Sequence, residues 1–195
     1  MKLDILTLGD YCTNCYLVWD EETKRCAVID PGYEPETISA RMSALGLTPA
    51  IILLTHGHFD HVGGVRPLAE KYRLPVYMHE ADLALPSYLA GGEPCNTAAY
   101  EDGSEVAMDS LTFRVLHTPG HTPGSVCLLC GGTMFSGDTL FAGVCGRTDL
   151  AGGNMFQMIG SLRKLRGLRG DYTVYPGHGN ATTLSYEREF NPYMR

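Results

Sequence analysis

The sequence contains no long apolar run and no run of five or more lysines and arginines. Its longest purely apolar stretch, residues 49–54, is far too short to span a bilayer. The N-terminal stretch carries Asp4 among its apolar residues and has no signal-peptide core, so we expect a cytoplasmic location. Because the formal net charge is −7, a nucleic-acid surface and a polybasic membrane contact are also not expected.

The sequence also lacks a segment of low complexity and an evident linker, so we expect one domain over residues 1–195. Its seven cysteines form an odd number, and a disulfide framework is therefore not expected. The pairs Cys12/Cys15 and Cys127/Cys130 have the spacing of a structural zinc site. In an apolar strand, however, positions i and i+3 face opposite sides, so Cys127 and Cys130 are expected in the core.

Apolar, β-branched runs separated by turn residues predict strands at residues 3–8, 14–19, 25–30, 49–55, 76–79, 111–117, 125–130, 133–136 and 172–175. Helices are predicted at residues 35–45 and 62–73, and from about residues 154 and 183. The helix that follows Asn154 is expected to carry its apolar face on Phe156, Ile159, Leu162 and Leu165. Two groups of mostly β structure, each closed by helices, predict a four-layer αββα sandwich of two mixed β-sheets flanked by helices, in the α/β (α+β) class.

Side chains that bind metals are concentrated in Gly- and Pro-rich turns that follow predicted strands. Residues 55–61 read Thr-His-Gly-His-Phe-Asp-His, and three later turns each place one His or Asp directly after a strand. Imidazole and carboxylate are common ligands of zinc and related ions. Exposed loop histidines that cluster by chance are the alternative, but four equivalent turns argue against it. The candidate ligands are His56, His58, Asp60, His61, His121, Asp138 and His178.

The chain resembles the metallo-β-lactamase-fold hydrolases and, among them, the compact glyoxalase II-like (hydroxyacylglutathione hydrolase-like) group. The resemblance rests on motifs at residues 14–18, 30–32, 55–61, 119–124, 137–141, 146–149 and 176–179. It implies one ion held by His56, His58 and His121. It implies a second ion held by Asp60, His61 and His178, with Asp138 shared by both. Two divalent ions are therefore expected, with zinc first and iron or manganese as alternatives.

The resemblance implies hydrolysis of a thioester such as S-lactoylglutathione by a hydroxide that bridges the two ions. Asp60 and Asp138 are the candidate catalytic carboxylates for proton transfer. Arg147 is the candidate for binding a substrate carboxylate, and an ion pair with Asp149 is its alternative role. Asp30 is expected to accept a hydrogen bond from a ligand histidine and to fix its tautomer. The expected partner is a small acyl thioester, with glutathione among the candidate thiols.

The sequence departs from full-length glyoxalase II enzymes after His178. Only 195 − 178 = 17 residues follow it, so the C-terminal helical domain that binds glutathione in those enzymes is not expected. Three alternatives stay open: a persulfide dioxygenase-like oxidoreductase with one iron, a lactone, lactam or other ester hydrolase of the same fold, and a metal-binding module without activity. His79 and His117 lie outside the ligand pattern, and His117 is the better candidate for a supporting role.

Overall fold

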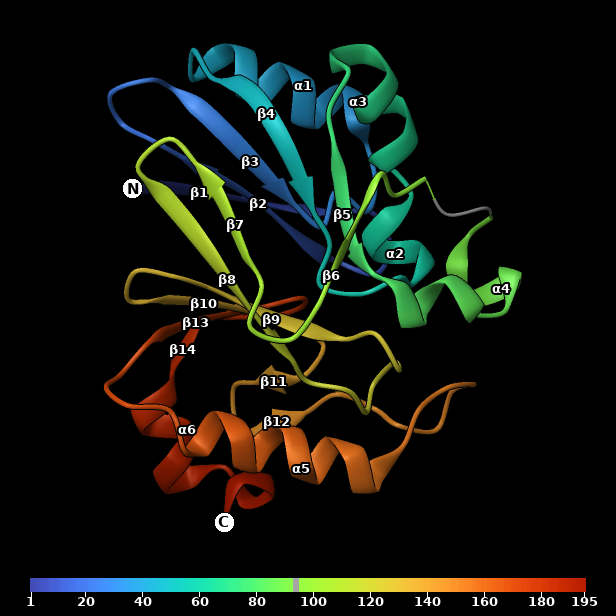
Figure 1. Ribbon diagram of the computed structural model, residues 1–195, viewed down its shortest axis with the longest axis vertical. Coiled ribbons are helices and arrows are strands. Elements are labelled where there is room, and N and C mark those ends of the chain that lie inside the picture. Colours follow the sequence, from blue (N-terminus) through green and yellow to red (C-terminus); the bar gives the residue numbers. More distant parts are fainter. Residues whose placement is uncertain (93–94) are drawn as a thin grey trace.

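Two six-stranded β-sheets lie face to face in the computed structural model, which describes residues 1–92 and 95–195 (Figure 1). The first sheet contains, in spatial order, β1 (Lys2–Leu8), β2 (Thr13–Trp19), β3 (Arg25–Ile29), β4 (Thr48–Leu53), β5 (Val76–His79) and β6 (Ala98–Tyr100). The second contains β14 (Thr182–Thr183), β13 (Thr173–Pro176), β10 (Thr133–Gly137), β9 (Val126–Cys130), β8 (Leu111–His117) and β7 (Glu105–Met108). A short hairpin joins β11 (Leu140–Phe141) and β12 (Val144–Cys145).

Helices cover the outer face of each sheet, which confirms the predicted αββα layers (Figure 1). The first sheet is covered by α1 (Pro35–Ala44) and α3 (Val65–Tyr72), and the second by α5 (Met155–Arg166), α6 (Leu184–Phe190) and the 3-10 helix η2 (Pro192–Met194). Shorter helices lie in the connections: α2 (Phe59–Val62), α4 (Ser87–Ala90) and the 3-10 helix η1 (Glu80–Ala84). None of the helices in the described ranges has the length and apolar character to cross a bilayer.

Alternating side chains build the core between the two sheets. Leu128 and Cys130 of β9 point into this inter-sheet core, whereas Cys127 packs under the outer helices. The predicted opposite orientation of Cys127 and Cys130 is therefore confirmed. All seven cysteines are free thiols, and none belongs to the clusters of potential metal ligands found in residues 1–92 and 95–195.

The helix predicted at residues 62–73 corresponds to α3, and a separate short helix, α2, ends at Val62 before Gly63 and Gly64. The backbone turns there because it packs against the loop after β3: Gly64 N donates to Pro31 O at 2.8 Å, and a Cβ on Gly63 would lie 2.4 Å from Gly32 O. The strands β6 and β7 were not predicted. They have only three and four residues, and neighbouring strands stabilise them.

The apolar face predicted for α5 is wrong in part. Asn154 caps the helix as expected, accepting from Gln157 N, and Leu162 and Leu165 are buried. Phe156 and Ile159, however, are exposed, and their places on the buried face are taken by Met158 and Ser161. The helix is rotated because Ser161 Oγ donates to Pro119 O at 2.7 Å and Met158 lies against Gly120.

This rotation predicts that two apolar truncations in α5 differ strongly in their effect on stability. Leu162→Ala removes a side chain that is 1% exposed and should lower the free energy of unfolding by about 2–5 kcal/mol. Phe156→Ala removes a ring that is 87% exposed and should change it by about 0.5 kcal/mol or less. Urea denaturation of both variants measures the difference. A large loss in Phe156→Ala would contradict the orientation of α5.

Candidate metal centre

The predicted ligands lie at one edge of the sandwich because four strands end there. The strand β4 of the first sheet leads into the turn that carries His56, and β8, β10 and β13 of the second sheet lead to His121, Asp138 and His178. The parallel pairing of β10 with β13 brings Asp138 and His178 to the same edge. The structure therefore brings all seven candidate ligands together in three overlapping groups.

Three buried imidazoles form the first group. His58 Nδ1 and His121 Nε2 lie 2.9 Å apart, and the ring of His56 lies 4.9 Å from each of the other two rings, centre to centre. All three residues are buried. Their nitrogen atoms are close enough to one another to bind a single ion.

The second group consists of Asp60, His61 and His178. His178 Nε2 lies 3.2 Å from Asp60 Oδ2 and 3.4 Å from His61 Nε2. His61 Nε2 lies 3.7 Å from Asp60 Oδ2. These separations agree with a tetrahedral ion, whose bonds of about 2.0–2.1 Å place the ligand atoms about 3.3 Å apart.

Asp138 lies between the two groups. Its Oδ1 is 3.5 Å from His61 Nε2, and its Oδ2 is 3.5 Å from His121 Nε2 and 3.6 Å from His178 Nε2. One carboxylate thus faces nitrogen atoms of both groups. Gly177 leaves room for this approach, because a Cβ there would lie 2.2 Å from Asp138 Oδ1.

Several buried polar atoms at the centre lack a hydrogen-bond partner. They are His56 Nε2, His58 Nε2 and Asp138 Oδ1. An unsatisfied buried polar atom is costly, so such atoms need a ligand that the protein itself does not supply. His56 and Asp138 also lie, together with His61, close enough to one another to bind a single ion. The donor set therefore fits a metal centre.

Hydrogen bonds to the remote ring nitrogens orient the histidines. His61 Nδ1 lies 3.0 Å from Asp30 Oδ2, which is the contact predicted for Asp30. Asp30 also accepts from Thr55 N at 2.7 Å and from Thr55 Oγ1 at 2.6 Å. Since Thr55 Oγ1 is 3.1 Å from His56 Nδ1, one buried carboxylate orients two imidazoles, directly and through Thr55.

Backbone carbonyls orient two further histidines. His121 Nδ1 lies 2.8 Å from Arg147 O, and His178 Nδ1 lies 3.0 Å from Tyr11 O. A carbonyl only accepts, so each Nδ1 carries the proton and each Nε2 presents a lone pair to the centre. This is the arrangement found around histidines that bind metals.

The charge state of the centre depends on burial and on the two carboxylates. Burial, together with the neighbouring His121, lowers the pKa of His58 to about 4. Burial also holds the pKa of His56 well below its usual value, so both rings are neutral at pH 7, the form that binds metals. Burial disfavours the cation of His61, but Asp138 and Asp30 outweigh burial and raise the pKa of His61.

Other candidate residues lie farther out. The Arg147 side chain is exposed and pairs with both carboxylate oxygens of Asp149, at 2.7 and 2.8 Å. Outside the ligand groups, His79 and His117 stack with ring centres 4.2 Å apart. His117 Nε2 donates to Pro123 O at 2.8 Å and so contacts the turn of His121.

Two buried residues that support the ligand turns were not predicted. Asn14 donates from Nδ2 to Pro176 O and Gly179 O, on either side of His178. Asp82 accepts hydrogen bonds from the turns that carry His56 and His121. Asn14 lies within the motif at residues 14–18, whereas Asp82 lies in a stretch with no recognisable pattern.

Fold and site together define the architecture of a metal-dependent hydrolase. The family model described as the metallo-beta-lactamase superfamily matches residues 8–178. The chain belongs to this superfamily. Hydroxyacylglutathione hydrolase GloC of Haemophilus influenzae is 35% identical over 209 residues, an alignment that covers 100% of this chain and 98% of GloC.

Solved structures agree with this assignment. BLEG-1 B3 metallo-beta-lactamase superposes with a TM-score of 0.90 at 35% identity and covers 99% of each chain. TTHA1623 in a di-iron-bound form gives 0.87 at 41% identity, covering 97% of this chain and 99% of its own. ETHE1 from Myxococcus xanthus gives 0.86 at 33% identity, covering 98% of this chain and 84% of its own.

The position of Asp138 between the two groups predicts that its removal affects both ions. Asp138→Ala should lose bound metal and hydrolytic activity together, because both groups lose a shared ligand. Elemental analysis of the purified variant measures the metal. His79→Ala is the control and should keep the metal content of the wild type. An Asp138→Ala variant that retains the full metal content would contradict the shared position.

Proposed function

We propose that the protein is a thioester hydrolase with two metal ions, and that S-lactoylglutathione or a related acyl thioester is its substrate. The observation that carries the proposal is the grouping of seven donors into two sets joined by one carboxylate, Asp138. The similarity to GloC over the full length of both chains supports the acyl-glutathione class.

In this proposal His56, His58 and His121 hold one ion. Asp60, His61 and His178 hold the other, and Asp138 contacts both. Ligand sets rich in imidazole suit zinc, and iron or manganese are the alternatives. Two divalent ions bound there would lower the pKa of a water toward neutrality and offer positive charge to a developing oxyanion.

The chain's own residues orient the ligands and carry the proton. Hydrolysis adds water across the carbonyl–sulfur bond and releases a carboxylate and a thiol. We assign the proton released from water to Asp60 or Asp138, the two carboxylates of the centre. The ions would add a local charge of about +4 to a chain of formal charge −7, so an anionic substrate remains compatible with the acidic composition.

The second candidate is a persulfide dioxygenase-like oxidoreductase with one iron held by two histidines and one aspartate. The similarity to ETHE1 is the observation that supports this candidate. Persulfide dioxygenases share the motif at residues 55–61, so the feature that favours the hydrolase is the Gly-Asp-Thr-Leu-Phe motif at residues 137–141. Lactone and lactam hydrolysis are the remaining alternatives within the fold. The similarity to BLEG-1 B3 metallo-beta-lactamase supports lactam hydrolysis.

One sample distinguishes these candidates. Purified protein is analysed for metal content and then tested for hydrolysis of S-lactoylglutathione, for oxygen consumption with glutathione persulfide, and for turnover of a lactone and a lactam. We expect two ions per chain and thioester hydrolysis that a chelator abolishes. One iron per chain with oxygen consumption would overturn the proposal, as would turnover of the lactam or lactone alone.

We further propose that Arg147 binds a carboxylate of the substrate, exchanging its partner Asp149 for it. Arg147→Ala should then raise KM several-fold while kcat stays close to the wild-type value, because the lost contact exists equally in the ground and transition states. Steady-state kinetics with S-lactoylglutathione measure both constants, and Asp149→Asn is the matched control. An unchanged KM in Arg147→Ala would restrict Arg147 to its ion pair with Asp149.

A further inference from the structure

A buried carboxylate outside the ligand groups links two of the ligand turns. Asp82, in η1, is 1% exposed. Its Oδ2 accepts from Gly57 N at 2.8 Å and from Thr122 Oγ1 at 2.9 Å, and its Oδ1 accepts from Gly124 N at 2.6 Å. Gly57 lies between His56 and His58, and Thr122 follows His121, so Asp82 bonds to both turns of the three-imidazole group.

We propose that Asp82 is a positioning residue that sets the separation of these two turns and thereby preorganises the three-imidazole group for its ion. The proposal rests on the two-ion centre proposed above. Asp82 contacts no ligand atom itself and acts through Gly57, Thr122 and Gly124. Its three bonds fix the backbone that carries the imidazoles.

Asp82 packs closely against both turns, and the three donors around it suit a carboxylate. A Cβ on Gly124 would lie 2.6 Å from both Cγ and Oδ1 of Asp82, and a Cβ on Gly57 would lie 3.1 Å from Asp82 Cβ. Both glycines therefore allow the contact. An ionised carboxylate only accepts, and it satisfies three donors on its two oxygens. An amide in the same place would turn its NH₂ toward at least one of these donors.

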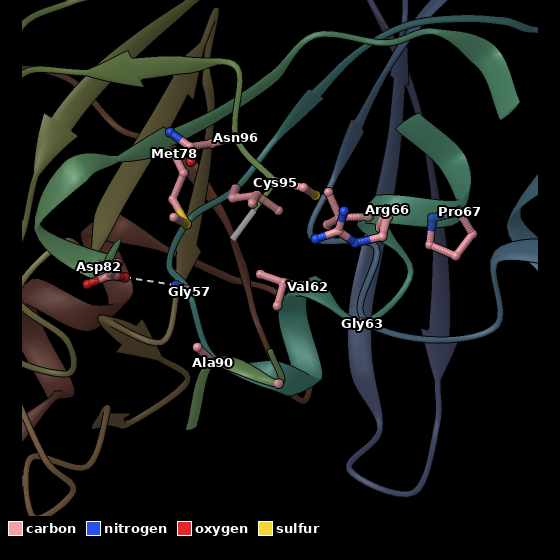
Figure 2. A pocket seen from close by; sticks show the side chains of 13 residues that line it. Gly57, Val62, Gly63, Arg66, Pro67, Met78, Asp82, Ala90, Cys95 and Asn96 are labelled. Atoms are coloured by element: carbon pink, nitrogen blue, oxygen red, sulfur yellow. Dashed lines mark hydrogen bonds between the residues drawn. The ribbon is translucent and has the colours of Figure 1, made fainter. Parts of the chain in front are cut away.

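The turn of Gly57 borders a cavity on the side of Asp82. This cavity of about 230 Å³ is lined by Gly57, Asp82, apolar side chains that include Val62 and Met78, and the polar side chains of Arg66 and Asn96. Figure 2 shows Asp82 at one end of this cavity, with its hydrogen bond to Gly57 drawn. The hydrogen bond from Gly57 N to Asp82 Oδ2 therefore restrains the turn between His56 and His58 on the side where it borders the cavity.

Asp20 provides a matched control. It is also buried, at 3% exposure, and it accepts from Glu22 N, Thr23 N, Ser110 N and Ser110 Oγ. Its partners lie in turns that carry no candidate ligand. Asp20→Asn therefore removes the same kind of hydrogen-bonded carboxylate without touching the metal centre.

The test titrates zinc into the metal-free protein against a competing chelator. Asp82→Asn should weaken the binding of one of the two ions by about 10–100-fold, the range for residues that orient metal ligands. In a His178→Ala background, which leaves the three-imidazole group intact, Asp82→Asn should weaken zinc binding by the same factor. In a His121→Ala background it should have no effect. Asp20→Asn should keep both wild-type affinities, even if thermal melting shows that it is less stable.

Thr122→Val is the milder second variant, and it tests the same proposal if Asp82→Asn does not fold. It removes one donor to Asp82 and should weaken the same ion by a smaller factor. Wild-type affinity for both ions in either variant would overturn the proposal and reduce Asp82 to a stability role. Zinc binding needs no substrate, so a wild type that binds two ions without hydrolysing thioesters would refute the proposed function and leave the test of Asp82 intact.

Discussion

The metal centre depends on hydrogen bonds made by the ring nitrogens that face away from it. Asp30 orients His61, and the carbonyls of Arg147 and Tyr11 orient His121 and His178. These acceptors fix the tautomers, so the remaining nitrogen atoms meet at the centre as lone pairs. Without such acceptors, the nitrogen atom that each ring presents to the centre as a lone pair would not be fixed.

The fold supplies this arrangement by ending its strands at one edge. Strands from both sheets lead into turns that carry ligands at this edge, and the core between the sheets holds the two sheets together. The ligand turns follow strands that are hydrogen-bonded into the two sheets. Turns held in this way by a scaffold can position functional side chains.

Much of this was predictable from sequence, because the signals are local. The αββα layers follow from the order of apolar runs, and the seven candidate ligands follow from turns directly after strands. Residues with distant partners were not predictable. Asp82 bonds to turns 25 and 42 residues away in sequence, and the inner face of α5 is decided by contacts of Ser161 and Met158 with the turn at 119–120. The short strands β6 and β7 depend in the same way on neighbouring strands.

The proposed chemistry depends above all on two ions that are held by the seven ligand side chains and share Asp138. Crystals of the metal-loaded protein, measured at the absorption edge of the bound metal, test it most directly. A centre of two ions should give two anomalous peaks about 3.5–4 Å apart, with the Asp138 carboxylate between them. A single peak at full occupancy, bound by only one of the two groups, would contradict it.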